Sequence, residues 1–237
     1  YQVLALEKDQ NYIILANHQT DLDPVYLALH FPRPLYMVAN ENLFNGSLLS
    51  RLLSYAIGPI RKEKANPNDM SCIRDIVTTA KEGGSILIFP EGNTAWADYQ
   101  FYIAPAIAKL VKMTKLPLVL FNLEGGYGTS PRWGRSRRRG PYTGEIREIL
   151  SVEEIKAMSA EELHHRIVKG LRVIDADSGK RYTSPRRAEY LERLLFLCPS
   201  CGGISTLRSD GAFVSCSCGM KAEYTEEMTL RSDDPDF

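Results

Sequence analysis

The stretch NYIILANHQTDLDP, residues 11–24, joins a run of apolar residues to a histidine and two aspartates. Residues 11–17 predict a buried β-strand, because a short apolar run bounded by polar residues suits a strand that is covered on both faces. A strand that only needed to end would be followed by Gly, Asn or Pro. His18 and the acids behind it therefore indicate chemistry at the end of this strand.

Further apolar runs alternate with segments of helical spacing. We expect the other strands at 34–40, 85–89 and 116–126, and helices at 24–30, 47–57, 66–82, 101–115, 152–158, 160–172 and 184–196. Capping-box patterns open two of these helices, at Ser151 with Glu154 and at Ser159 with Glu162. Strands that alternate with helices favour an α/β fold with a mostly parallel central sheet flanked by helices.

The composition excludes some classes of protein. In the 237 residues, 29 basic side chains balance 29 acidic ones, so the charge gives no reason to expect nucleic acid as a partner. No apolar run approaches the 18 or more residues that a membrane helix needs, and the first residues show no signal-peptide pattern. Because the chain starts at Tyr1 inside an apolar run, we expect a segment to be missing upstream.

The expected strands end in residues that carry chemistry. Sites in open α/β sheets form at the carboxyl ends of strands, so His18, Asp23 and Glu91 are expected to meet in one crevice. Histidine is the most frequent general base near neutral pH, and a carboxylate on one ring nitrogen leaves the other free to accept a proton. Taken singly, the histidine is more often a surface residue, Glu91 fits a helix N-terminus and Arg61 fits a solvated turn.

Four motifs follow one another in the chain: NHQTDLD from residue 17, GPIR ending at Arg61, FPEGN from residue 89, and LPLVLF from residue 116. Together they resemble the four motifs of the glycerolipid acyltransferase family, the type that makes phosphatidic acid from lysophosphatidic acid. The resemblance covers about residues 10–145, and the first and third motifs are the most specific.

This resemblance implies direct acyl transfer from acyl-CoA or acyl-carrier protein to a lysophospholipid, as in a 1-acyl-glycerol-3-phosphate O-acyltransferase. His18 takes the proton from the acceptor hydroxyl, and Asp23 orients His18 and stabilises the imidazolium. Backbone N–H groups of the helix after Asp23 are expected to hold the oxyanion. The residues implied for the acceptor and its phosphate are Arg61, Glu91, Gly92 and Asn93. The implied location is the cytoplasmic side of a membrane, either peripheral or anchored by a segment outside this chain.

The third motif departs from the family pattern, which is usually Phe-Pro-Glu-Gly-Thr-Arg-Ser. Asn93 and Thr94 stand where the family has Thr and Arg, and Leu120 replaces the second Pro of the fourth motif. The motifs therefore leave the identity of the acceptor open, and another lysolipid or an amino-lipid is the nearest alternative to lysophosphatidic acid. An alternative of another class is a zinc-ribbon adaptor that has lost catalysis. A hydrolase is disfavoured because the sequence has no G-x-S-x-G motif.

Residues 132–139 contain five arginines and one tryptophan. One interpretation is a flexible, solvated loop. A second is contact with an anionic membrane surface, where each basic residue contributes roughly 1 kcal/mol and Trp favours the interface. A third is contact with the phosphates of coenzyme A.

Four of the five cysteines cluster near the C-terminus with the spacing C-x2-C-x14-C-x-C. This pattern, with a hairpin signal at Asp210-Gly211 between the pairs, favours a zinc ribbon over disulfides or free thiols. A closed four-cysteine site would make the zinc structural, with Cys198, Cys201, Cys216 and Cys218 as ligands. We divide the chain into an acyltransferase domain at 1–195, the ribbon at 196–227 and a disordered tail at 228–237. Cys72 is expected to be a core residue.

Overall fold

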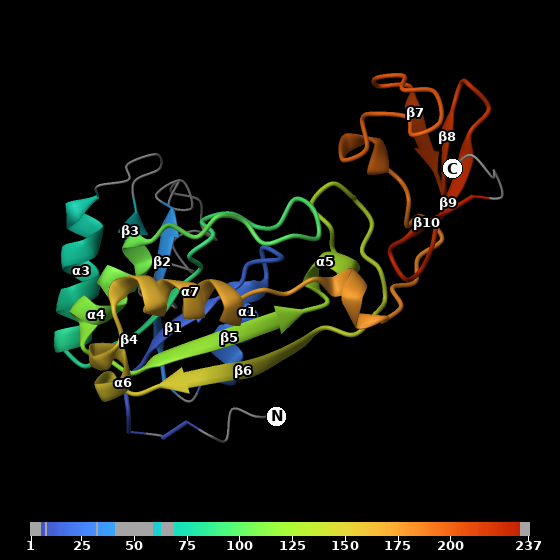
Figure 1. Ribbon diagram of the computed structural model, residues 1–237. Coiled ribbons are helices and arrows are strands. Elements are labelled where there is room, and N and C mark those ends of the chain that lie inside the picture. The colour runs from blue at the N-terminus through green and yellow to red at the C-terminus, as the bar shows by residue number, and fades with distance from the viewer. Residues whose placement is uncertain (1–5, 8, 32, 41–58, 63–68, 233–237) are drawn as a thin grey trace.

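The computed structural model describes residues 6–7, 9–31, 33–40, 59–62 and 69–232 (Figure 1). Its main sheet has the strand order β3-β2-β4-β1-β5-β6 within these residues. Strands β1 to β5 are parallel, and β6 pairs with β5 in the antiparallel direction. The strands are β1 Ile13–Ala16, β2 Leu35–Asn40, β3 Ile60–Lys62, β4 Ser85–Ile88, β5 Leu118–Glu124 and β6 Thr143–Leu150.

Helices cover both faces of this sheet, which confirms the predicted α/β class. The side chains of β1 alternate, with Ile13 and Leu15 packing toward α3, α4 and α7, and Ile14 and Ala16 packing on the face that α1 covers. The helices are α1 Asp23–His30, α3 Met70–Lys81, α4 Ala106–Thr114, α5 Gly126–Thr129, α6 Val152–Ala157 and α7 Ala160–Gly170. None of the helices in the described ranges is both long enough and apolar enough to cross a bilayer.

Most of the expected elements form. Both predicted capping boxes are made, at the starts of α6 and α7. Helix α4 begins only after Pro105, which becomes its N-cap residue. The helix expected at 47–57 and the first residues of the helix expected at 66–82 lie outside the described residues. Asp69 caps α3 by accepting from the Cys72 N–H. Cys72 is buried, as expected of a core residue, and burial raises the pKa of its thiol to about 11.

Several features differ from the sequence-based expectation, and two of them are the short strand β3 and the short helix α5, neither of which was expected. Strand β6 was not expected, because it is an edge strand with mostly exposed and polar side chains and so lacks an apolar run. The helix expected at 184–196 is wrong, and only a short 3-10 turn, Leu191–Arg193, forms there. Backbone groups that a helix would pair internally form hydrogen bonds with other parts of the chain instead. The Arg187 carbonyl accepts from Arg138, the Ala188 N–H donates to the Gly211 carbonyl, and the Tyr190 N–H donates to Ser209.

A second, antiparallel sheet of the order β10-β9-β8-β7 lies at one end of the molecule in Figure 1. Its strands are β7 Leu207–Asp210, β8 Phe213–Cys216, β9 Lys221–Tyr224 and β10 Leu230–Arg231. The hairpin predicted at Asp210-Gly211 joins β7 to β8, and Gly211 has the positive φ of 56° that such a turn requires. The division into domains stays a prediction, but β10 forms within the segment expected to be a disordered tail.

The arginine-rich segment 132–139 is anchored by two buried side chains, Trp133 and Arg138, while its other four arginines are exposed. Trp133 is fully buried, its indole N–H donates to the Tyr127 hydroxyl at 3.0 Å, and its ring meets the Tyr224 ring edge-on. Trp133 belongs to the core of the second sheet. The membrane-interface role considered for this tryptophan is therefore wrong, because its ring is not available to a bilayer.

Candidate active site

The first motif begins where β1 ends. The Asn17 side chain continues the pairing of β1 with β5, because its amide donates to the Leu123 carbonyl at 2.8 Å and its carbonyl accepts from the Leu123 N–H at 2.7 Å. His18 follows at the carboxyl edge of the sheet, stacked on Phe89 with ring centroids 4.2 Å apart. The backbone at His18 is thus held by β5, and its ring is held by the residue that follows β4.

His18 and Asp23 form the predicted pair. His18 Nδ1 lies 2.9 Å from Asp23 Oδ2, and the Asp23 side chain is fully buried while that of His18 is 17% exposed. This contact leaves the other ring nitrogen, Nε2, to meet a substrate proton. The geometry is that of a general base with an orienting carboxylate.

Four further groups hold the Asp23 carboxylate. The backbone N–H groups of Gln19 and Thr20 donate to Oδ2 at 2.6 and 3.0 Å. The hydroxyls of Thr20 and Tyr142 donate to Oδ1, each at 2.6 Å. Burial, together with the charge of Asp23, raises the pKa of Tyr142, so its hydroxyl stays a donor at neutral pH. A buried carboxylate needs such partners to remain charged.

Sequence reasoning missed Tyr142. It lies just before β6, 119 residues after Asp23 along the chain, and no motif marks it. The only signal was compositional: tyrosine is a side chain that can pack in a core and still present a hydroxyl. Its contact with Asp23 depends on the antiparallel pairing of β6 with β5, which the sequence did not reveal.

Glu91 also comes to this site, from the turn after β4. Its Oε1 accepts from the His18 N–H at 3.4 Å, and its Oε2 accepts from the Phe101 N–H at 2.9 Å. Burial raises the pKa of Glu91. Gly92 has a φ of 71°, in the left-handed region that the turn requires, and Asn93 is exposed. Glu91 therefore ties the third motif to the first through backbone groups.

Arg61 lies farther away. It is an exposed residue of β3, and in the strand order β2 and β4 separate β3 from β1. Three strand spacings amount to about 14 Å. The structure therefore brings His18, Asp23 and Glu91 together and places Arg61 toward the edge of the sheet. Its predicted contact with an acceptor phosphate stays a prediction.

The expected oxyanion donors are not available at the start of α1. Pro24 has no N–H, the Asp23 N–H donates to the Thr20 carbonyl, and the N–H groups of Val25 and Tyr26 both donate to the Leu22 carbonyl. That expectation is wrong because the turn that positions Asp23 consumes these donors in its own hydrogen bonds.

The four C-terminal cysteines converge at one point of the second sheet. Their Sγ atoms all lie within 4.8 Å of one another, and the pairs Cys198–Cys218 and Cys201–Cys216 are 3.8 Å apart. A tetrahedron with Zn–S bonds of ~2.3 Å has edges of about 3.8 Å, whereas a disulfide needs sulfur atoms only ~2 Å apart. The donor set therefore fits a four-coordinate zinc ion.

Comparison with known proteins agrees with this geometry. A family model described as Acyltransferase matches residues 3–121, which are 119 of the 237 residues. A 1-acyl-sn-glycerol-3-phosphate acyltransferase of Streptococcus pneumoniae (strain ATCC BAA-255 / R6) is 29% identical over 112 residues. Those residues are 47% of this chain and 42% of that protein, so the chain matches less than half of that relative's length.

A solved structure is also similar. The 1-acyl-sn-glycerophosphate (LPA) acyltransferase PlsC from Thermotoga maritima matches with a TM-score of 0.58 at 20% identity, over 72% of this chain and 69% of that one. At this identity the likeness shows that the two proteins share a fold. The family match includes the His18–Asp23 pair and the Glu91 turn. The chain belongs to the acyltransferase family, in agreement with the resemblance of its motifs to those of glycerolipid acyltransferases.

Proposed function

We propose that the protein transfers a fatty acyl group from acyl-CoA or acyl-carrier protein to the hydroxyl of lysophosphatidic acid, giving phosphatidic acid for phospholipid synthesis. The observation that carries this proposal is the contact of His18 Nδ1 with the buried Asp23 carboxylate at 2.9 Å. The name of the Streptococcus relative supports lysophosphatidic acid as the acceptor.

The proposed reaction needs no covalent enzyme intermediate. His18 Nε2 takes the proton of the acceptor hydroxyl while the hydroxyl oxygen attacks the thioester carbonyl, and Asp23 stabilises the resulting imidazolium. The tetrahedral intermediate then collapses, the carbon–sulfur bond breaks, and the leaving thiolate takes the proton back from His18. General-base assistance of this kind is worth roughly 10²- to 10⁴-fold in rate.

The acceptor is the least constrained part of this proposal. Thr94 stands where the family has Arg, so another lysolipid stays the nearest alternative. An inactive adaptor would have no need for the five donors that hold Asp23 and orient His18, and this favours an enzyme. Because the substrates are lipids, we propose action at the cytoplasmic side of a membrane, through peripheral contact or a segment outside this chain.

We also propose that the four cysteines hold a structural zinc ion. A closed set of four thiolates leaves no position open for a substrate. The second sheet is small, and a bound metal would contribute directly to its folding.

The first prediction concerns activity. Mass spectrometry of a panel of lysolipids incubated with acyl-CoA or acyl-carrier protein should show acylated lysophosphatidic acid with the wild-type protein. His18→Ala should lower the rate by roughly 10²- to 10⁴-fold, because the general base is lost. His165→Ala, an exposed histidine on α7, is the matched control and should act like the wild type.

Preference for another lysolipid would keep the mechanism and reject the proposed acceptor. A His18→Ala protein as active as the wild type would contradict the mechanism. If the zinc-loaded protein acylated no lysolipid from either donor, the adaptor would become the better account.

The second prediction concerns Tyr142. Tyr142→Phe keeps the ring and removes one donor to Asp23, so kcat should fall about tenfold with little change in KM. The pH profile of kcat/KM should also move to higher pH, because a carboxylate with one donor fewer holds a protonated imidazole more strongly. Tyr102→Phe, at a side chain that is 77% exposed, is the control. An unchanged kcat and pH profile in Tyr142→Phe would mean that this hydroxyl has no positioning role.

The third prediction concerns the metal. Elemental analysis of the purified protein should find about one zinc ion per chain, and Cys201→Ser should lower the zinc content and the thermal stability. Cys72→Ser should keep the zinc, because Cys72 lies on α3 in the other core. Full zinc retention by Cys201→Ser, or a wild-type protein with no bound metal, would contradict the zinc site.

A further inference from the structure

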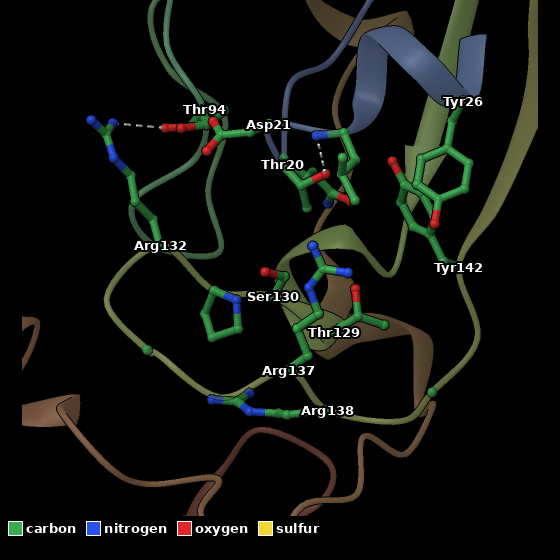
Figure 2. Close-up of a pocket in the computed structure, with 15 residues that line it drawn as sticks. Thr20, Asp21, Tyr26, Thr94, Thr129, Ser130, Arg132, Arg137, Arg138 and Tyr142 are labelled. Carbon is green, nitrogen blue, oxygen red and sulfur yellow. Dashed lines mark hydrogen bonds between the residues drawn. The ribbon is translucent and has the colours of Figure 1, made fainter. Parts of the chain in front are cut away.

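A pocket of about 480 Å³ lies between the turn that follows β1 and the segment 129–142 (Figure 2). Thr20 and Tyr142 line this pocket, and the same two side chains donate to Asp23 Oδ1. Thr94, directly after the third motif, lines it as well. The pocket therefore borders the first and third motifs at once, and its volume is in the range of small-molecule sites, about 300–1,000 Å³.

The lining of the pocket is polar and carries net positive charge. Three arginines line it, Arg132, Arg137 and Arg138, against one carboxylate, that of Asp21. Asp21 is exposed. The hydroxyl groups of Thr94 and Ser130 also line it. The Thr20 and Tyr142 hydroxyls donate to Asp23, and the Thr129 hydroxyl donates to the Gly126 carbonyl. Guanidinium and hydroxyl donors around one hollow suit an anion with several acceptor oxygens.

Arg138 anchors the segment that supplies these arginines. Its guanidinium lies 4.9 Å from the centre of the Trp133 ring and 5.1 Å from that of Tyr224, and it donates to the carbonyls of Gly128 and Arg187. The Arg138 N–H donates to the Thr129 carbonyl at 2.8 Å. Arg137 stands directly before this anchor, so the packing of Arg138 holds the backbone from which the Arg137 side chain extends.

Arg137 and Arg132 are the side chains left to bind a ligand. Figure 2 shows the Arg137 guanidinium pointing into the hollow between Thr129 and Thr20, whereas Arg138 points away from it. Arg132 donates to the Thr94 carbonyl at 3.4 Å and lies over the Trp96 ring. Among the described residues, no carboxylate lies within 4.0 Å of either guanidinium as an ion-pair partner.

We propose that this pocket binds a phosphate group of one of the two substrates, with Arg132 and Arg137 as its ligands. The inference rests on the proposed function, in which both the lysophosphatidic acid and the CoA donor carry phosphate. Arginine matches the oxygens of a phosphate in a bidentate way. A flat membrane surface fits less well, because Arg137 points into a hollow and Trp133 is buried.

Calorimetry with two probes tests the site and identifies its source of phosphate. Glycerol 3-phosphate represents the acceptor headgroup, and coenzyme A represents the donor. We expect one probe to bind the wild-type protein and to bind the double variant Arg132→Gln/Arg137→Gln roughly tenfold or more weakly. The control is Arg139→Gln, which removes the same charge at an exposed residue outside the pocket lining and should bind like the wild type. Thermal unfolding should show that both variants stay folded.

Weaker binding of coenzyme A alone would assign the pocket to the donor, and weaker binding of glycerol 3-phosphate alone would assign it to the acceptor. The KM for the same substrate should rise, with kcat nearly unchanged. Equal binding of both probes to the wild type and the double variant, or no binding of either, would overturn the proposal. The proposal would also be overturned if the double variant bound vesicles of anionic phospholipid more weakly than the wild type but bound both probes equally well. Probe binding does not depend on turnover. Absence of acyl transfer would therefore count against the proposed function, while the binding data would still test the pocket.

Discussion

The burial of one carboxylate governs the arrangement of this site. Asp23 is fully buried, and a charge in that position is costly unless hydrogen bonds replace the water it loses. The turn between β1 and α1 supplies backbone donors, and Tyr142 supplies a hydroxyl from beside β6. The same hydrogen bonds fix the turn in which His18 lies. The donors that stabilise the buried charge of Asp23 therefore also orient the His18 ring.

A second buried carboxylate, that of Asp175, contacts the first motif through Gln19. Asp175 accepts from the Gln19 side chain at 3.0 Å and from the N–H groups of Gly125 and Gly128 at 2.8 and 3.1 Å. Burial raises the pKa of Asp175. These contacts and Tyr142 come from residues beyond 121, where the family match ends. The part of the chain outside that match therefore helps to hold the motif.

Local patterns predicted the central strands, the capped helices and the motif residues, because apolar runs, capping boxes and motif spacing are all visible within a few residues. The features that were missed depend on long-range contacts. Tyr142 meets Asp23 only through the antiparallel pairing of β6, and residues 184–196 lose their helix to bonds with Arg138, Ser209 and Gly211. The burial of Trp133 likewise depends on the second sheet, which no local pattern places beside it.

The most direct test of the central claim is the tautomer of the His18 ring, measured by ¹⁵N NMR of the resting protein at a pH where the ring is neutral, with His18→Ala to assign the signal. We predict that the proton of the neutral ring lies on Nδ1, where Asp23 holds it, and that Nε2 keeps a free lone pair. A ring with the proton on Nε2 would contradict this prediction, because Asp23 would then not orient His18 as a base.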